Sequence, residues 1–486
     1  MLVIFTYIMG LLMAFEPITD NDYFWHIVIG KWVDINKAIP SKELFSWFGT
    51  LKDYDWTSHE WLTEWIMYKA GHIGCIILML IIFIGLYILM TKMLKINLKK
   101  WLDFRLLYLL LMTVFFKVTG PRPYIISLLF FAYFVYILFN YLDKNKPIFN
   151  KLIWTIPIVQ ILWANLHGGS SSLPYVFIIG ILLCDFVLKL FKNKEQRWGS
   201  YLLDKKQIKT LLILLGTILL TTCINPTGIN LLLYPFTNMA DSSMIDTILE
   251  WKSPSFHGLL GIYIFIIIAV PIATSILYHK KIKFYEIALL GLMLFMCLRS
   301  QRFIGMYGIY STWIVGKYFF FTDSMYERLK KPFIKFQKYI QTLVIILIIV
   351  IISITAKVQF NNFNKVYDNH GYYSDEIINK LIELKPERMY NDFGAGGYLL
   401  FKLSERDLEQ EIKLFIYGLG DVFSTNILPD SNNLFYLKTD PKEMINKYNF
   451  DVILTIKNSP LRQFLFYSDE WNIYYYDDTA YIFIKR

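Results

Sequence analysis

The stretch "CIILMLIIFIGLYILM", Cys75–Met90, decides the class of this protein. It contains no charged residue, and with its flanks it is long enough to cross the roughly 30 Å hydrocarbon core of a bilayer as a helix. The whole chain agrees with it, because 55% of its 486 residues are hydrophobic, only 18% are charged and the mean hydropathy is +0.41. Such a composition is typical of a membrane protein.

Similar apolar runs recur along the chain and predict about eleven membrane-spanning helices. Several of the runs are short, so we expect some crossings to be broken or partial. The first run has neither a basic flank nor a small-residue cleavage site, and we interpret it as a membrane helix rather than a signal peptide. The predicted spans lie near residues 1–17, 66–90, 105–119, 124–142, 152–165, 173–191, 208–224, 258–278, 283–298, 303–321 and 338–355.

Lysine and arginine gather in every second connection between the predicted spans. Because basic connections stay on the cytoplasmic side, this alternation predicts a multi-pass protein of the plasma membrane with a cytoplasmic N-terminus. The segment 18–65 and the tail after residue 355 then lie outside. Anchoring to anionic membrane lipids accounts for the net charge of +10, and no nucleic-acid partner is expected. The four cysteines lack CxxC spacing and indicate neither a disulfide framework nor a zinc site.

The chain is predicted to contain a membrane domain, 1–355, with a large first external loop, 18–65, and an extracytoplasmic α/β domain, 356–486. In the tail, "PERMYNDFGAGGYLLFKL" predicts a strand, a glycine turn and a helix, and "IKLFIYG" predicts a strand. "DPKEMINKYNFDVILTI" predicts a helix and a strand, and the last sixteen residues predict a hairpin turned at Asp477–Thr479. The fold class is therefore an α-helical polytopic membrane protein with a C-terminal α/β domain.

Three glycines of the tail, Gly394, Gly396 and Gly397, stand where a strand is expected to pass into a helix. A glycine-rich turn at such a place can hold a phosphate group. Their spacing lacks the third glycine of a dinucleotide fingerprint, so a tight turn is the preferred interpretation.

The first external loop carries Asp20, Asp22 and His26, and Asp22 and His26 share one face if the segment is helical. Tryptophans around them favour a position at the level of the lipid headgroups. The acids can simply cap a helix, with His26 as a surface partner. Alternatively, Asp20 and Asp22 can chelate a divalent cation, or one of them can act as a general base. We treat all three residues as candidate catalytic residues, and the two acids also as candidate metal ligands.

The same loop ends in "HEWLTE", which adds Glu60 and Glu64. This motif lacks the second histidine of a zinc-peptidase HExxH helix, so a peptidase is not indicated. Together with the acids near residue 20, the two glutamates predict a polar site in which they bind substrate.

The other external loops hold the remaining candidate substrate-binding residues. Asn165 and His167 interrupt an apolar stretch next to two glycines, and arginines stand at the outer ends of spans, where basic residues are disfavoured. An arginine there can snorkel to the headgroups or bind a phosphate with its guanidinium fork. The candidate arginines are Arg122, Arg299 and Arg302.

The motifs "DNDYFWHIVIGKWV", "IPSKELFSWFG", "SHEWLTEWIMY", "NLHGG", "NPTG", "EWKSP" and "RSQRF" occur in this order between the predicted spans. As a set they resemble a bacterial family of integral membrane proteins of the GT-C glycosyltransferase superfamily. "YNDFGAGGYL" and "FDVILT" resemble the C-terminal domain of that family, so the resemblance extends over nearly the whole chain.

The resemblance implies a glycosyltransferase of the cell envelope. It would move a sugar from a polyprenyl-phosphate donor to a glycan, lipid or protein on the outer face of the membrane, with Asp20 or Asp22 as base or as ligand of Mg²⁺ or Mn²⁺. One departure is that relatives often carry an Asp-x-Arg pattern where this chain has "IYGLGD", with Tyr417 and Leu419 at those places. Two alternatives stay open, a non-catalytic partner in surface-polysaccharide assembly and a transporter or flippase. A transporter calls for charged residues within the spans, where Asp185 is the main example.

Overall fold

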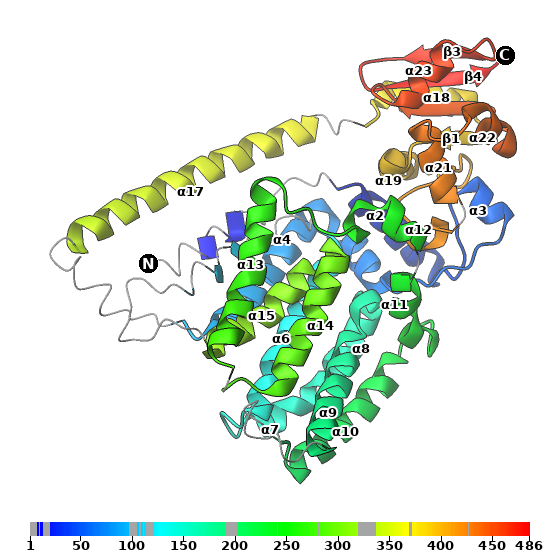
Figure 1. Ribbon diagram of the computed structural model, residues 1–486. Helices are drawn as coiled ribbons and strands as arrows, with labels where there is room; N and C mark the ends of the chain where they lie inside the picture. Colours follow the sequence, from blue (N-terminus) through cyan, green and yellow to red (C-terminus); the bar gives the residue numbers. More distant parts are fainter. Residues whose placement is uncertain are drawn as a thin grey trace. The chain divides into compact units, whose positions relative to one another are not determined.

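The computed structural model divides the chain into two compact units (Figure 1). The first comprises Met1–Pro17, Ile76–Leu232 and Glu250–Phe363, and the second Ile18–Cys75, Leu233–Leu249 and Asn364–Arg486. Most of the predicted spans 1–17 and 105–119 lies outside the described residues, and the expected domain boundary at residue 355 stays a prediction. The structure describes residues 7–8, 10–12, 20–96, 105, 108–109, 111–112, 121–190, 202–240, 242–279, 281–318, 337–368, 372–425 and 427–486.

Within these described ranges, four helical segments are long and apolar enough to cross a membrane, which supports the membrane class predicted from hydropathy. They are α4 (Trp61–Leu94), α6 (Tyr124–Leu142), Gly168–Leu190 and α13 (Gly258–Leu277). The number of about eleven spans is not confirmed. The segment Gly168–Leu190 comprises η2 (Gly168–Ser170) and α9 (Leu173–Leu190). The other helices of the first unit are α7 (Phe149–Leu152), η1 (Ile153–Thr155), α8 (Ile156–Leu166), α10 (Lys205–Thr222), α14 (Phe284–Arg299), η5 (Gln301–Phe303) and α15 (Ile304–Tyr318), together with most of η4 (Leu249–Trp251) and of α17 (Gln337–Asp368).

Helices α6, α9, α14 and α15 pack against one another around an aromatic core. Phe139 of α6 lies with its ring 5.4 Å from Tyr310 and 5.5 Å from Trp313, both on α15. Phe177 of α9 meets Tyr310 edge-on at 5.2 Å. All four side chains are almost completely buried. Edge-to-face rings of this kind add stability beyond the apolar area that they bury.

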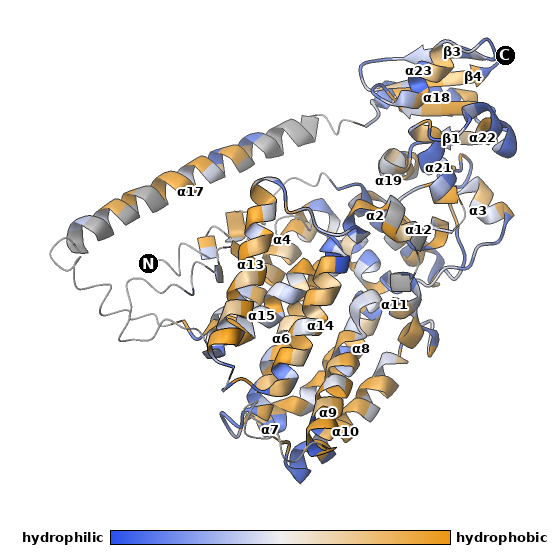
Figure 2. Cartoon of the chain, viewed as in Figure 1, coloured by the Kyte–Doolittle hydropathy of each residue, from blue (hydrophilic) through white to orange (hydrophobic). Residues whose placement is uncertain are grey.

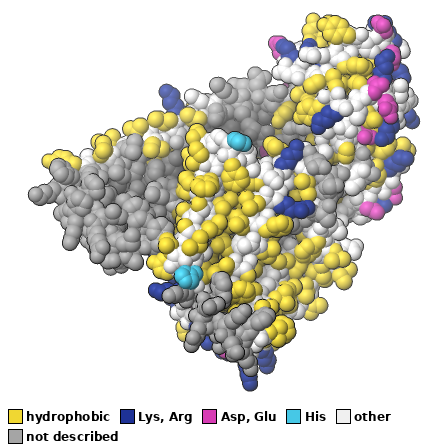
Figure 3. Space-filling view, viewed as in Figure 1, with side chains coloured by type: hydrophobic (Ala, Val, Ile, Leu, Met, Phe, Trp, Pro, Cys, Tyr) yellow, Lys and Arg dark blue, Asp and Glu magenta, His cyan; other side chains and the backbone are white. Residues whose placement is uncertain are grey.

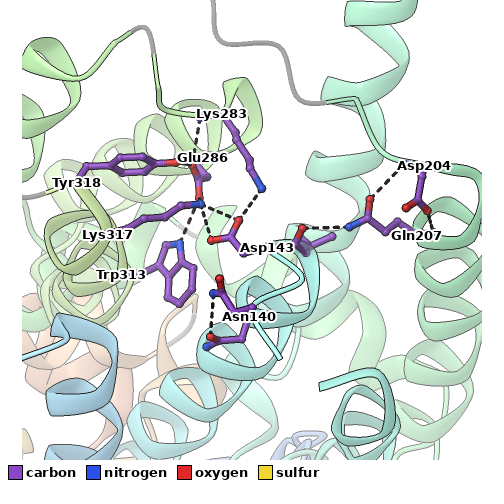
Figure 4. A network of polar contacts seen from close by, with 11 residues as sticks. Asn140, Asp143, Asp204, Gln207, Lys283, Glu286, Trp313, Lys317 and Tyr318 are labelled. Carbon is purple, nitrogen blue, oxygen red and sulfur yellow. Dashed lines mark hydrogen bonds and ion pairs between the residues drawn. The ribbon is translucent and has the colours of Figure 1, made fainter. Parts of the chain in front are cut away.

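A network of buried charges lies at one end of this core (Figure 4). Lys317 of α15 contacts Asp143, just after α6, at 2.6 Å and Glu286 of α14 at 2.9 Å, and Lys283 contacts Asp143. Tyr318 and Trp313 also donate hydrogen bonds to Glu286. Two acids and two lysines leave the set formally neutral, which is the condition under which buried charges are tolerated. No sequence motif marks this set, because each member stands near a helix end.

Many helix residues of the first unit are hydrophobic, and hydrophobic side chains cover much of the face of these helices that is seen in the space-filling view (Figures 2 and 3). On α13 the side chains of Leu259, Ile262 and Phe265 are exposed by 75%, 54% and 61%. A helix that leaves such residues uncovered in water would be costly, whereas lipid tails cover them without penalty. This surface therefore agrees with a position in a membrane.

The second unit combines the first long loop with the C-terminal tail. Its only sheet within the described residues has four strands in the order β1-β2-β4-β3, with β1 parallel to β2 and the other pairs antiparallel. The predicted closing hairpin is confirmed as β3 and β4, and the predicted helix and strand before it as α22 and β2. Besides the start of α4, the unit holds α2 (Asn21–Asn36), α3 (Trp47–Leu51), α12 (Ser242–Thr247), α18 (Asp375–Leu384), β1 (Met389–Asn391), α19 (Phe393–Ser404), α20 (Gly420–Phe423), α21 (Ile427–Phe435), α22 (Pro441–Tyr448), β2 (Val452–Ile456), α23 (Pro460–Phe466), β3 (Trp471–Tyr476) and β4 (Ala480–Lys485). The residues of helix α11 (Asn230–Ala240) are divided between the two units, with Leu233–Ala240 in the second.

The predicted strand "IKLFIYG" is wrong as a member of the sheet. Leu414 makes backbone hydrogen bonds with Phe45 and Trp47 of the first loop, both at 2.9 Å, and forms a single bridge with Ser46. The side chain of Asn391 then takes the place of a neighbouring strand by accepting from the Phe415 amide at 2.8 Å. The apolar run reflects complete burial of this segment, which is a property that a strand and a buried loop share.

Candidate functional site

The first predicted acids lie at the start of α2. Asp20 is the N-cap of the helix, and its carboxylate accepts from the Asp22 amide at 3.0 Å. Asp22 in turn accepts from the indole of Trp25 at 3.2 Å. Asp20 thus caps the helix, as one of the two interpretations of the sequence predicted. Both carboxylates lie at the N-terminal end of α2. The roles of both acids in catalysis or metal binding stay predictions.

One turn further along α2, His26 is buried against two carboxylates. Its Nδ1 lies 2.9 Å from Oε1 of Glu64 and 3.9 Å from Oε2 of Glu60. Glu64 belongs to the first turn of α4, Glu60 directly precedes that helix, and the ring of Trp25 lies 3.7 Å from the imidazole. The three predicted residues of the first loop are therefore one cluster, and their ligand atoms all lie within 4.8 Å of one another. Such a group could hold a metal ion.

A glycine allows α2 and α4 to approach closely enough for this cluster to form. A β-carbon at Gly30 would lie only 2.1 Å from the carbonyl oxygen of Glu64, so no other residue fits there without movement. Gly30 follows His26 by four residues, which places both on the same face of α2. A glycine four residues after His26 is therefore a sequence signal that another segment packs closely against this face of α2. The sequence does not indicate that this segment is α4.

Three further residues, none of them predicted from the sequence, extend the cluster. Nε2 of His59 lies 2.9 Å from the hydroxyl of Tyr234 on α11, and that hydroxyl donates to Asp421 of α20 at 2.5 Å. Burial and the Asp421 carboxylate keep the pKa of Tyr234 well above its usual value, so the phenol remains a donor. Because Tyr234 donates to Asp421, it accepts from His59, whose Nδ1 faces Glu60 at 3.9 Å. Asp421 is the acid of "IYGLGD", the place at which the chain departs from the resembling family.

Several of the tail glycines, but not Gly394, allow close packing, and none of the three predicted ones forms the expected turn. Gly394, Gly396 and Gly397 all lie inside α19, so the predicted turn is wrong. A β-carbon at Gly397 would lie 2.4 Å from the carbonyl oxygen of Asn21 on α2, and one at Gly418 would lie 2.5 Å from the Asp22 carboxylate. The glycines thereby let the C-terminal segment contact the start of α2 directly.

Two of the three predicted arginines, Arg122 and Arg302, form a second group in the first unit. Arg122 is paired with Glu250, and the guanidinium of Arg302 lies 5.1 Å from the ring of Trp251 and 5.5 Å from that of Tyr124. Burial acts to raise the pKa of Glu250, but the two arginines outweigh it and hold that pKa below its usual range. The guanidinium of Arg302 thus has its N–H donors beside two aromatic rings. A guanidinium in such a position suits recognition of an anion.

His167 lies on the other side of the same tyrosine. Its ring meets Tyr124 at 5.8 Å, and its Nδ1 lies 2.6 Å from the hydroxyl of Ser127. That hydroxyl also accepts from the indole of Trp163 at 2.7 Å, so Ser127 links the two rings. His167 and Arg302 are consequently brought together around one ring.

Two predicted residues have other surroundings. The amide of Asn165 donates to the backbone carbonyls of Ile161 and Ile224 at 2.8 and 2.7 Å, so it ties the end of α8 to the segment after α10. Arg299 is exposed, and its carbonyl oxygen lies 3.5 Å from the hydroxyl of Ser253. A substrate-binding role for either residue stays a prediction.

No family model matches the chain, and no curated protein matches it. Two solved structures of the archaeal oligosaccharyltransferase AglB from Archaeoglobus fulgidus are similar to it. One, in complex with an inhibitory peptide and a dolichol-phosphate, is 10% identical, with a TM-score of 0.49 over 93% of this chain and 69% of that chain. The other, in the apo form, is 12% identical, with a TM-score of 0.48 over 94% of this chain and 69% of that chain. The likeness carries no conclusion about the reaction or substrates of this chain.

Proposed function

We propose that the protein is a membrane glycosyltransferase that moves a sugar from a polyprenyl-phosphate-linked donor to a hydroxyl of a glycan, lipid or protein acceptor. The single observation that carries the proposal is the cluster of carboxylates around His26, built from the loop motifs that resemble the GT-C superfamily. The alternation of basic connections supports an N-terminus in the cytoplasm and a reaction on the outer face of the plasma membrane.

In the proposed reaction the acceptor oxygen attacks the anomeric carbon of the donor sugar. The bond between that carbon and the phosphate oxygen breaks, and polyprenyl phosphate leaves. Asp20 or Asp22 takes the proton of the acceptor hydroxyl as general base. Asp22 lies in the first turn of α2, where its Oδ1 accepts from the indole of Trp25 at 3.2 Å.

The donor phosphate needs cations or N–H donors. Arg122 and Arg302 of the first unit supply guanidinium groups. The guanidinium of Arg302 lies near the rings of Tyr124 and Trp251. Binding of phosphate there would compete with the pairing of Arg122 and Glu250. A divalent cation, Mg²⁺ or Mn²⁺, would add charge neutralisation at the leaving phosphate.

The transporter alternative has less support. Ionisable residues buried in a membrane bundle mark an ion or substrate path when they face one. The buried charges of the first unit, Asp143, Lys283, Glu286 and Lys317, are instead paired with one another. Asp185, the predicted exception within a span, is paired with Lys189 and accepts from the amide of Leu203 at 2.8 Å.

The proposal is tested with Asp20→Asn and Asp22→Asn at matched expression. If one carboxylate is the general base, its amide should lower the amount of transferred sugar by about 10²–10⁴-fold, whereas asparagine remains a good helix cap. Asp53→Asn is the matched control, since Asp53 is an exposed acid of the same loop with a left-handed backbone that asparagine accepts. Normal product from both variants and from the double variant would reject the assignment of these acids.

A further inference from the structure

Glu64 is the most deeply buried charged group near the start of α2. Its side chain has no measurable exposure, and Oε1 is within hydrogen-bond distance of His26 while Oε2 has no hydrogen-bond partner in the described part of the chain. A buried carboxylate oxygen without a partner costs several kcal/mol unless a proton or a cation is placed against it. This oxygen therefore indicates that something occupies the space beside it.

The spacing of the neighbouring ligand atoms fits a metal ion. Two ligands that each lie about 2.1 Å from one ion are about 3 Å apart when adjacent and at most about 4.2 Å apart when opposite. The distance from His26 Nδ1 is 2.9 Å to Glu64 and 3.9 Å to Glu60, both inside this range. The widest separation in the group is within 4.8 Å, so a side-chain adjustment of about half an ångström completes the site.

The kinds of ligand indicate the kind of metal. Imidazole nitrogen suits the first-row transition metals, whereas Mg²⁺ and Ca²⁺ prefer sites made of oxygen atoms alone. Two carboxylates and one imidazole also balance the charge of a dication closely. We propose that His26, Glu60 and Glu64 bind a single Mn²⁺ or Zn²⁺ ion, with coordination positions left open for water or an oxyanion.

Residues outside the ligand set hold one ligand in place. His59 faces Oε1 of Glu60 at 3.9 Å, and the chain from His59 through Tyr234 ends on the Asp421 carboxylate. Outer partners of this kind orient metal ligands, and their loss weakens metal binding by about 10–100-fold. Tyr234 is thus a positioning residue, and the C-terminal segment contributes to the site through Asp421.

The experiment measures metal binding by the full-length protein in detergent, without a histidine tag and without donor or acceptor. After stripping with chelator, we expect about one bound Mn²⁺ per chain by electron paramagnetic resonance. Zn²⁺ should displace it, and a tenfold excess of Mg²⁺ should not. Thermal unfolding should shift upward with Mn²⁺, because a ligand that binds only the folded state stabilises it.

Three variants test the assignment. Glu64→Gln and Glu60→Gln should each weaken Mn²⁺ binding at least tenfold, and Tyr234→Phe should weaken it by a smaller factor. Glu43→Gln is the matched control: Glu43 is a buried glutamate of the same unit, but it accepts from the amides of Phe45 and Ser46 and should not affect the metal. Because Glu60 is partly exposed, its variant remains informative if Glu64→Gln fails to fold.

Two outcomes would overturn the inference. One is a wild-type protein that binds neither ion above the level of a chelator-treated control. The other is Mn²⁺ binding that survives Glu60→Gln and Glu64→Gln unchanged. The inference is independent of the proposed reaction, since whichever of Asp20→Asn and Asp22→Asn lowers sugar transfer should retain the metal.

Discussion

A methyl group at Gly418 should disturb the start of α2 from the C-terminal side. The added β-carbon would lie 2.3 Å from Nε1 of Trp25 and 2.5 Å from Oδ1 of Asp22. Ordinary van der Waals contact begins at 3.4 Å, so the segments must separate by about 1 Å at this point. The hydrogen bond of 3.2 Å between Trp25 and Asp22 stands directly in the way.

The size of the effect follows from the burial of this contact. Trp25 is only 5% exposed and packs between His26 and Tyr417, with ring distances of 3.7 and 6.3 Å, so it has little room to retreat. Forcing an extra carbon into a filled interior costs about 1–3 kcal/mol. Displacement of a catalytic group by about 1 Å lowers the rate by about 10²-fold. We therefore expect Gly418→Ala to lower the unfolding temperature modestly and the transfer of sugar strongly.

The assay compares Gly418→Ala with Gly394→Ala, by thermal unfolding in detergent and by product formation in cells at matched expression. The control glycine lies in the same glycine-rich tail, but a β-carbon there would meet no atom within 4 Å. Alanine at a helical position is favoured over glycine by about 0.5–1 kcal/mol, so the control should be as stable as the wild type or more stable. If Gly418→Ala behaves like this control in both measurements, the close contact between the tail and α2 is refuted.

Two further predictions concern other buried charges. Burial raises the pKa of Asp392 to about 7, so this carboxyl stabilises the fold below about pH 4 and the contribution is lost as the pH rises to 7. The free energy of unfolding of the wild-type protein should fall by about 4 kcal/mol between pH 4 and pH 8, relative to that of the Asp392→Asn variant. Hydrogen exchange of β2 measures this free energy, and equal pH slopes for the two proteins would contradict the prediction. Glu286→Gln should cost about 3–5 kcal/mol in detergent unfolding, because it leaves Asp143 alone against two lysines. A second substitution, Lys317→Met, should restore neutrality and part of the loss, and an unchanged unfolding temperature in the single variant would show that the network contributes nothing.

The elements that the sequence predicted well are those with a strong local pattern. The run at Tyr124–Leu142 is apolar throughout, and its predicted bounds are those of α6. The hairpin at the end of the chain alternates and carries its own turn, so it was predicted as well. The segment around Leu414 failed for the opposite reason, since an apolar run records burial and does not record which backbone will be its partner.

The candidate site shows the same division. His26, Glu60 and Glu64 were predicted because they lie close together in one unusual loop. Tyr234 and Asp421 stand about 175 and 360 residues after His59 in the chain, in segments with no motif of their own. They join the cluster only through tertiary packing. The glycines before Asp421 were visible in the sequence, but their purpose depends on what lies opposite them in the fold.

The contacts of the tail with α2 bear on what the C-terminal segment does. If it were only attached to the candidate site, its contacts with the first loop would be exposed and replaceable. Instead Gly397 and Gly418 meet Asn21 and Asp22 at distances that exclude any side chain. Asp421 also ends the hydrogen-bonded chain that begins at His59. Residues far apart in the sequence therefore share one packed interior, and substitutions in the tail should act on the chemistry of the first loop as directly as substitutions within that loop.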